Sequence, residues 1–188
     1  MLTERNSQTR QTFPGPAQER ILIAFFSWGG NTRTIAREIG RQTGADLFEI
    51  VPVEPYSTDY DSAVKEARLD LGAQARPELA GHVPHFGEYG TFILGYPNWW
   101  SSIPMPVASF LEGYDFSFHK VVPFCSHGGG RLGDSLEAIA QLVPKAFLGQ
   151  ALAIPASGGA LLGRNVADWL DHNGLIKPWA TMSQPLRS

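Results

Sequence analysis

The chain has 188 residues, of which 43% are hydrophobic and 18% are charged, and its formal net charge is -3. These values are ordinary for a single globular domain, and they exclude wholesale disorder, a basic nucleic-acid-binding face and a polybasic membrane patch. Cys125 is the only cysteine. An intramolecular disulfide is therefore excluded, and a reducing compartment such as the cytoplasm is expected.

The two ends of the chain differ from its middle. Residues 1–18 are polar and lack the apolar segment of a signal peptide, which predicts a flexible leader. Residues 175–188 are expected to form a loose C-terminal tail, so the folded domain is placed at 19–174. No apolar run approaches the roughly 20 residues that a membrane span needs.

Strand-like and helix-like segments alternate between these ends. The first half predicts a strand at 20–26, a helix at 31–43, a strand at 46–53, a helix at 61–72 that stops at Gly72, and a strand at 91–96. The second half predicts a short helix opened by Pro104 and Pro106, a strand at 120–125, a helix at 133–143, a strand at 146–154 and a helix at 165–172.

Each helix has apolar residues at helical spacing, which are expected to face the core. They are Ile35, Ala36 and Ile39; Val64, Ala67 and Leu71; Val107, Phe110 and Leu111; Leu136, Ile139 and Ala140; and Val166, Trp169 and Leu170. Five strand–helix repeats predict an α/β three-layer sandwich, because parallel strands need right-handed crossovers that place helices on both faces. We expect a five-stranded parallel sheet in the order 2-1-3-4-5, with a ligand near the carboxyl ends of strands 1 and 3.

Three loops concentrate glycine, hydroxyl and aromatic residues, and this topology makes them neighbours. They are "SWGGNT" after the first strand, "PNWWSSIP" after the third and "SHGGGRLGDS" after the fourth. The loop after the second strand carries prolines and a tyrosine, and the loop after the fifth is "PASGGA". Neither has the same density of such groups. The first, third and fourth loops are therefore expected to line one pocket.

The first loop suits an anion, because unpaired N–H groups at a helix N-terminus carry a partial positive charge. Gly29 and Gly30 allow a close approach, and Ser27, Asn31 and Thr32 offer hydrogen-bond donors. The loop has neither the lysine of a Walker A motif nor a GxGxxG fingerprint. Read alone, it is equally a capped turn.

The other two loops indicate a flat ligand. Trp99 and Trp100 can stack on a planar ring, although one or both can instead cover the core. Gly128 and its neighbours offer backbone groups to a ring edge, and His127 can bind a ligand or face solvent. Cys125 is expected in the core. No zinc-type spacing surrounds His82 and His85, and no GxSxG elbow supports a hydrolase built on Ser27 and His127.

Taken in order, these motifs resemble the flavodoxins and flavodoxin-like FMN proteins. The resemblance runs from "ILIAFFSWGGNTRTIAREI" through "GADLFEIVPVEPYSTDY", "ARPEL" and "ILGYPNWWSSIPMPVASFLEGYDF" to "VVPFCSHGGGRLGDSLEAI". It covers about residues 20 to 172 and is strongest to a bacterial branch with GYPxWW and PFCxHGG motifs. It implies a flavodoxin-like fold that binds FMN non-covalently.

The resemblance also implies which residues hold the cofactor. Those around the phosphate are Ser27, Trp28, Gly29, Gly30, Asn31 and Thr32. Those flanking the isoalloxazine are Pro97, Asn98, Trp99 and Trp100 on one side and Ser126, His127, Gly128 and Gly129 on the other. Two features depart from the family: Gly29 stands where threonine or serine is usual, and the net charge of -3 is weak for an electron carrier.

Three functions fit these expectations, none of which assigns a catalytic acid, base, nucleophile or metal. The first is a flavodoxin that transfers electrons between redox partner proteins, a reductase and an acceptor, as a monomer or homodimer. The second is an FMN-dependent NAD(P)H:quinone or azo-compound oxidoreductase that uses a small quinone-like substrate. The third is a cofactor-free interaction module, for which Gly29 is the only argument.

Overall fold

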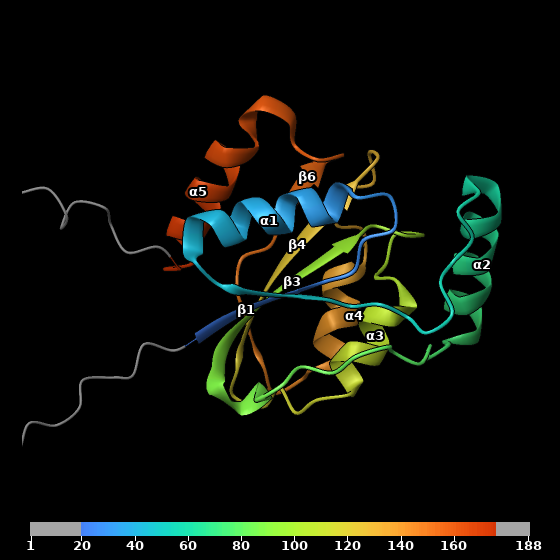
Figure 1. The fold of residues 1–188 in the computed structure, drawn as a ribbon, viewed down its shortest axis with the longest axis horizontal. Helices are drawn as coiled ribbons and strands as arrows, with labels where there is room; N and C mark the ends of the chain where they lie inside the picture. Colours follow the sequence, from blue (N-terminus) through green and yellow to red (C-terminus); the bar gives the residue numbers. More distant parts are fainter. Residues whose placement is uncertain (1–19, 176–188) are drawn as a thin grey trace, which may run out of the picture.

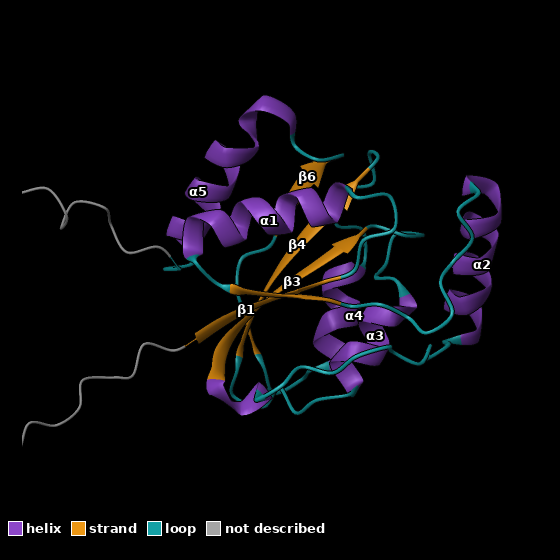
Figure 2. Cartoon of the chain, in the orientation of Figure 1, coloured by secondary structure: helices purple, strands orange, loops and turns teal. Residues whose placement is uncertain are grey.

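A computed structural model describes residues 20–175 of the chain and consists of one sheet with helices around it (Figures 1 and 2). The strands are β1 (Arg20–Phe25), β2 (Asp46–Glu49), β3 (Tyr89–Pro97), β4 (Lys120–His127), β5 (Phe147–Leu148) and β6 (Leu152–Pro155). All pairs are parallel, the order is β2-β1-β3-β4-β5, and β6 also pairs with β4. The predicted α/β fold and strand order are confirmed. The leader and almost all of the tail lie outside the described residues.

The helices are α1 (Asn31–Thr43), α2 (Tyr60–Ala73), α3 (Met105–Glu112), α4 (Ser135–Leu142) and α5 (Leu162–His172). Two short 3-10 turns lie at Phe86–Glu88 and Gly159–Leu161. Helices α1 and α5 cover one face of the sheet, and α3 and α4 cover the other (Figure 1). These are the two helical layers that the alternation of strands and helices predicts.

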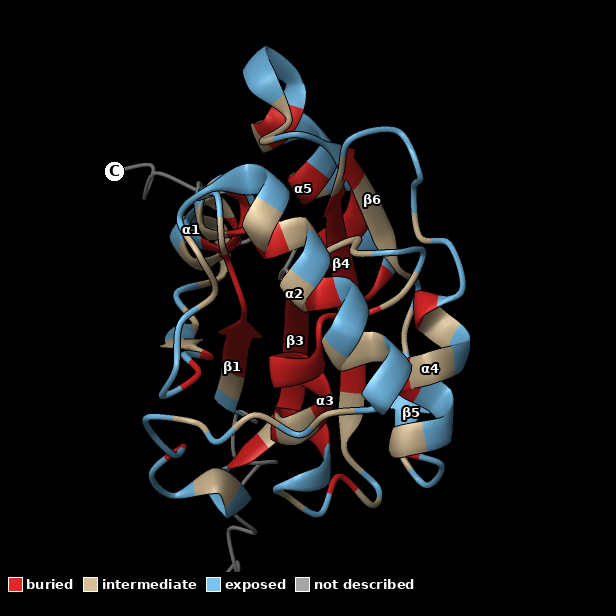
Figure 3. Ribbon diagram, turned by 90° about the vertical axis from the view of Figure 1, so that its right-hand side faces the viewer, coloured by how far each residue is buried: buried red, intermediate tan, exposed pale blue. Residues whose placement is uncertain are grey.

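Strand β1 illustrates how one strand supplies both cores. Leu22 and Ala24 belong to the core under α3 and α4, whereas Ile23 and Phe25 belong to the core under α1 and α5. Successive side chains of a strand point to opposite faces, so a strand covered on both sides is apolar throughout. Figure 3 shows the resulting band of buried residues along the central strands.

The last strand differs from the prediction, because the segment 146–154 breaks into β5 and β6. The break lies where Asn173, at the end of α5, binds the chain: its Oδ1 accepts from the N–H of Gln150 at 3.0 Å. The carbonyl of Gln150 in turn accepts from Trp169 Nε1 at 2.6 Å. These bonds turn the backbone toward α5 and interrupt the ladder with β4.

Helix α2 lies beyond the carboxyl ends of the strands rather than over a face of the sheet (Figures 1 and 3). Its only buried residues are Ala63 and Ala67, whereas Val64 and Leu71 are half-buried. It runs past Gly72 and ends before Gln74, which has a left-handed φ of 48°. The other predicted inward residues are at least half-buried except Ala140, which is exposed.

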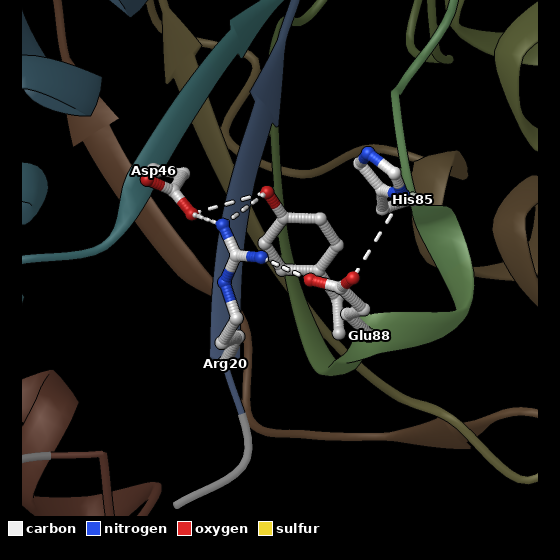
Figure 4. Close-up of polar contacts among 5 residues, drawn as sticks. Arg20, Asp46, His85 and Glu88 are labelled. Carbon is white, nitrogen blue, oxygen red and sulfur yellow. Dashed lines mark hydrogen bonds and ion pairs between the residues drawn. The ribbon is translucent and has the colours of Figure 1, made fainter.

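The amino edge of the sheet is closed by a group of polar side chains around Arg20 (Figure 4). Arg20 Nη2 donates to Asp46 Oδ2 at 2.7 Å and to the hydroxyl of Tyr89 at 3.2 Å, and Nη1 binds Glu88. These contacts connect β1, β2 and β3 where all three begin. The hydrogen bonds from Arg20 and then Tyr89 lower the pKa of the Asp46 carboxyl.

Candidate functional site

The carboxyl edge of the sheet contains a hollow of about 260 Å³, which we call the loop pocket. It is lined by Ser27, Trp28, Gly29, Asn31, Thr32, Tyr60, Pro97, Asn98, Trp99, Ser126, His127 and Gly128. Every predicted site residue except Gly30, Trp100 and Gly129 therefore lies on its wall. The topology brings the first, third and fourth loops together because β1, β3 and β4 are adjacent strands.

The first loop presents backbone donors to this pocket. Gly30 precedes α1 with a φ of 89°, a conformation that glycine adopts without cost, and it turns the chain into the helix. Ser27 Oγ accepts from the N–H of Arg33 at 3.2 Å and so caps the first turn. Within residues 20–175, the N–H groups of residues 28–32 have no hydrogen-bond partner. They remain available to an anion.

Arg33, the cation closest to this loop in sequence, does not serve the loop pocket. Its Nε donates to Glu49 Oε2 at 3.0 Å, and the pair holds the start of α1 to the end of β2. The hydrogen bonds to Glu49 raise the pKa of Arg33 further, so the two charges neutralise one another. An anion in the loop pocket would therefore be held by backbone and neutral donors.

A pair of buried hydroxyls joins the loop after β1 to the end of β4, where the loop after β4 begins. Thr32 Oγ1 and Ser126 Oγ lie 2.8 Å apart, and the two residues are 1% and 3% exposed. Asn98 connects the loop after β3 to the loop after β4, because its N–H donates to the carbonyl of Ser126 at 2.8 Å and its Nδ2 donates to that of Arg131 at 2.7 Å. The pocket wall is thus fastened across strands.

The two tryptophans of the third-strand loop have different positions. Trp99 packs edge-on against Phe26 and Tyr56, with ring centroids 5.4 Å and 5.0 Å away, and so covers the top of the core. Trp100 is 45% exposed. Its Nε1 donates to the carbonyl of Val64 in α2 at 3.1 Å, and the Arg68 guanidinium lies 4.9 Å from its ring centroid.

Trp100 and Ser101 form a tight turn in a conformation that favours glycine. Their φ angles are 54° and 60°, and the flanking Trp99 and Ser102 exchange backbone hydrogen bonds of 3.0 Å and 3.1 Å. Two consecutive left-handed residues define a type I′ turn, for which Asn-Gly is the usual sequence. Left-handed backbone costs a non-glycine residue about 1–2 kcal/mol, so the fold holds Trp100 in place against this strain.

His127 is held in one tautomer at the rim. Its Nδ1 accepts from the N–H of Gly129 at 3.0 Å, which leaves Nε2 to carry the proton of the neutral ring. Partial burial and the nearby Arg131 lower the pKa of His127. The pocket is therefore lined by a neutral donor at this point. Cys125, below it, is fully buried, and burial raises its pKa to about 12.

The site also contains residues that the sequence did not indicate. Tyr60, the first residue of α2, lines the loop pocket, and its ring centroid lies 6.1 Å from that of Trp28. The loop after β2 contributes as well, since Trp28 Nε1 donates to the carbonyl of Ser57 at 2.8 Å. The only indication in the sequence was the tyrosine in the proline-rich segment after the second strand. The sequence alone did not show that this segment lies next to the loop pocket.

No cluster of metal-binding side chains is found among residues 20–175. In the same part of the chain, no helix is long and apolar enough to cross a membrane.

The fold and the position of the loop pocket define an α/β protein of the flavodoxin-like class. The flavodoxin family model matches residues 20–173, so the chain belongs to the flavodoxin family. No curated protein shows significant similarity to the sequence.

Solved structures share the fold. A protein of Bacteroides eggerthii with a provisional flavoprotein assignment is 26% identical, covers 82% of this chain and 98% of its own, and superposes with a TM-score of 0.73. A Bacteroides uniformis protein with the same provisional assignment is 22% identical over 81% of this chain and 98% of its own, with a TM-score of 0.73. A Lactobacillus acidophilus flavoprotein in complex with FMN is 17% identical over 80% of this chain and 98% of its own, with a TM-score of 0.63.

Proposed function

We propose that this chain binds FMN non-covalently in the loop pocket and transfers electrons between redox partner proteins. The observation that carries the proposal is the set of unpartnered N–H groups at residues 28–32, a segment of which all but Gly30 lines a pocket walled by aromatic rings in a flavodoxin family member. A phosphate needs such donors, and a flat ring needs such walls. The resemblance to the bacterial branch with GYPxWW and PFCxHGG motifs is part of this proposal.

The donor set fits the phosphate of FMN. Backbone N–H groups of the first loop would bind it, with the side chains of Ser27 and Asn31 beside them. The hydroxyl of Thr32 is already paired with Ser126, so we assign Thr32 to positioning the loop rather than to a strong phosphate bond. Gly30 and Gly129 allow the loops to turn, with φ angles of 89° and 137°. Pro97, Asn98 and Trp99 would flank the ring opposite His127 and Gly128.

The pocket would also influence the redox chemistry that bound FMN supplies. No lysine, arginine, aspartate or glutamate is among the described residues on its wall, and His127 has a lowered pKa. Aromatic packing on a wall without a cationic side chain disfavours an anionic reduced flavin, which lowers the reduction potential. This environment suits an electron carrier that passes electrons on to an acceptor.

The direct test is a titration of cofactor-free protein with FMN, riboflavin and FAD. FMN is expected to bind at one equivalent and more tightly than riboflavin, because only FMN carries the phosphate that the first loop would hold. Equal affinity for FMN and riboflavin would contradict the assignment of the first loop. A ferredoxin-type reductase with NADPH should then bleach the bound flavin. Steady NADPH oxidation without that reductase would contradict a pure carrier.

Gly29 offers a sharper test of the same loop. It is exposed, its φ is not left-handed, and a Cβ added there would meet nothing within 4 Å. Gly29→Thr adds a hydroxyl beside the proposed phosphate, and one more neutral hydrogen bond stabilises the complex by about 1 kcal/mol. We expect FMN to bind about fivefold more tightly, with riboflavin unchanged. Gly29→Val is the matched control of similar shape, and an equal gain there would contradict the phosphate contact.

A further inference from the structure

A second hollow adjoins the loop pocket on the side of α2. Its volume is about 270 Å³, and we call it the α2 pocket. It is lined by Trp28, Tyr60, Ala63, Val64, Ala67, Asn98, Trp99 and Trp100. The two pockets share Trp28, Tyr60, Asn98 and Trp99, so a ligand in one lies against the wall of the other. Of the glycines at residues 128–130, only Gly128 lines either pocket, and it lines the loop pocket.

The walls of the α2 pocket favour a flat, uncharged ligand. Aromatic rings line it, and none of the described residues on its wall carries a charge. The indole N–H groups of Trp28 and Trp100 are already bound to the carbonyls of Ser57 and Val64. These bonds fix the orientation of both rings and leave their N–H groups unavailable to a polar ligand. Ring faces that are held in place stack on another ring at little entropic cost.

The α2 side of the pocket leaves room for such a ring. Ala63 and Ala67 are the buried residues of α2, and their small side chains leave the space between helix and tryptophans open. Larger apolar residues at these positions would fill it, as they do under α3, where Val107, Phe110 and Leu111 are buried. The α2 pocket therefore exists because α2 faces the tryptophans with the small side chains of Ala63 and Ala67.

Polar contacts hold much of α2 in place. A ligand can therefore enter the α2 pocket when the helix moves locally. Tyr56 donates to Asp70 at 2.6 Å, and the N–H of Ser57 donates to Glu66 at 2.8 Å. A helix with few buried apolar residues opens at a lower free energy than the core does. Trp100, which lines the α2 pocket and contacts α2 through Val64, is 45% exposed.

We propose that the α2 pocket binds a planar, uncharged electron acceptor of the quinone class. The inference rests on the proposed function, because the electrons come from FMN in the loop pocket. A quinone there takes two electrons and two protons from the reduced flavin. Its two carbonyl oxygens become hydroxyls, and the flavin returns to its oxidised form. A reductase protein supplies the next electron pair, as in the proposed function.

The test fills the α2 pocket without touching the loop pocket. Ala67→Leu adds three carbons at a residue that lines only the α2 pocket, whereas Ala73→Leu makes the same change at an exposed position of the same helix. Calorimetry measures menadione binding to the FMN-loaded, oxidised proteins. Stopped-flow absorbance then measures reoxidation of the dithionite-reduced flavin by menadione. FMN stoichiometry and circular dichroism are recorded for each protein.

We expect the wild type and Ala73→Leu to bind menadione and to show a reoxidation rate that saturates with its concentration. Ala67→Leu should retain one FMN while its menadione affinity falls about tenfold or more. An FMN-loaded wild type that does not bind menadione overturns the inference and leaves the proposed function intact. Loss of FMN as well as menadione in a folded Ala67→Leu also overturns it, because the flavin ring would then occupy the α2 pocket. A wild type that binds no FMN overturns both proposals.

Discussion

The two edges of the sheet are built in opposite ways. At the amino edge, Arg20 satisfies Asp46, Glu88 and Tyr89 at once, so the charges that meet there bind one another (Figure 4). At the carboxyl edge, N–H groups of residues 28–32 have no partner among the described residues, and Trp100 is held in a left-handed conformation. Unused donors are typical of a binding edge, whereas left-handed residues occur at both edges, since His85 beside Glu88 has a φ of 53°. The difference indicates which edge carries function and which only closes the sheet.

The largest effect is expected from the hydroxyl pair that fastens the carboxyl edge. Thr32→Val keeps the shape of the side chain but leaves the buried Ser126 hydroxyl without its partner. An unsatisfied buried group costs about 1–3 kcal/mol, so the free energy of unfolding of cofactor-free protein should fall by that amount in denaturant titrations. The double variant Thr32→Val, Ser126→Ala should recover part of the loss. A double variant that is destabilised by the sum of both single effects would contradict the pairing.

A smaller effect of opposite sign is expected at the strained turn. Ser101→Gly places glycine at the second central position of the type I′ turn, where φ is 60°. The release of left-handed strain should raise the free energy of unfolding by about 1 kcal/mol. Ser101→Ala, which also removes the hydroxyl but keeps Cβ, is the control and should not stabilise the protein. A gain in both variants would mean that the hydroxyl, and not the backbone, is responsible.

Local patterns were sufficient to predict the sheet and the loops of the site. Apolar runs of strand length and helical spacing of residues such as Ile35 and Ile39 depend only on neighbours in sequence. The strand order then follows from the alternation, and the order brings three loops together. Most of the loop pocket was therefore accessible from sequence.

The features that were missed depend on contacts between distant residues. The spacing of Val64, Ala67 and Leu71 indicates an apolar face of α2, but the same pattern would fit a face of the sheet or its edge. The break between β5 and β6 comes from the side chain of Asn173, which is 23 residues from Gln150. The different positions of Trp99 and Trp100 follow from the turn whose central residues are Trp100 and Ser101. None of these features can be read from the periodic spacing of apolar residues along the sequence.

The smallest effect is expected at the amino edge, and it depends on pH. Arg20 and Tyr89 lower the pKa of Asp46 in the folded state below that of an unfolded aspartate, which is about 3.9. The unfolded state then binds more protons in acid. The contribution of Asp46 is therefore fully present above about pH 5 and is lost as the pH falls through its folded pKa. Because Asp46 is half exposed, this contribution should stay below about 1 kcal/mol.

Asp46→Asn tests this assignment against the wild type in unfolding titrations between about pH 5 and pH 2. Other carboxylates, such as Glu38 with its pKa of about 2, destabilise both proteins in acid, so only the difference between the two curves reports on Asp46. The variant should be slightly less stable at the upper end and should approach the wild type at the lower end. Its FMN affinity should equal that of the wild type at every pH, because Asp46 lies at the opposite edge. A change in FMN affinity would mean that the two edges are coupled through β1, and the separation of a closing edge from a binding edge would then be wrong.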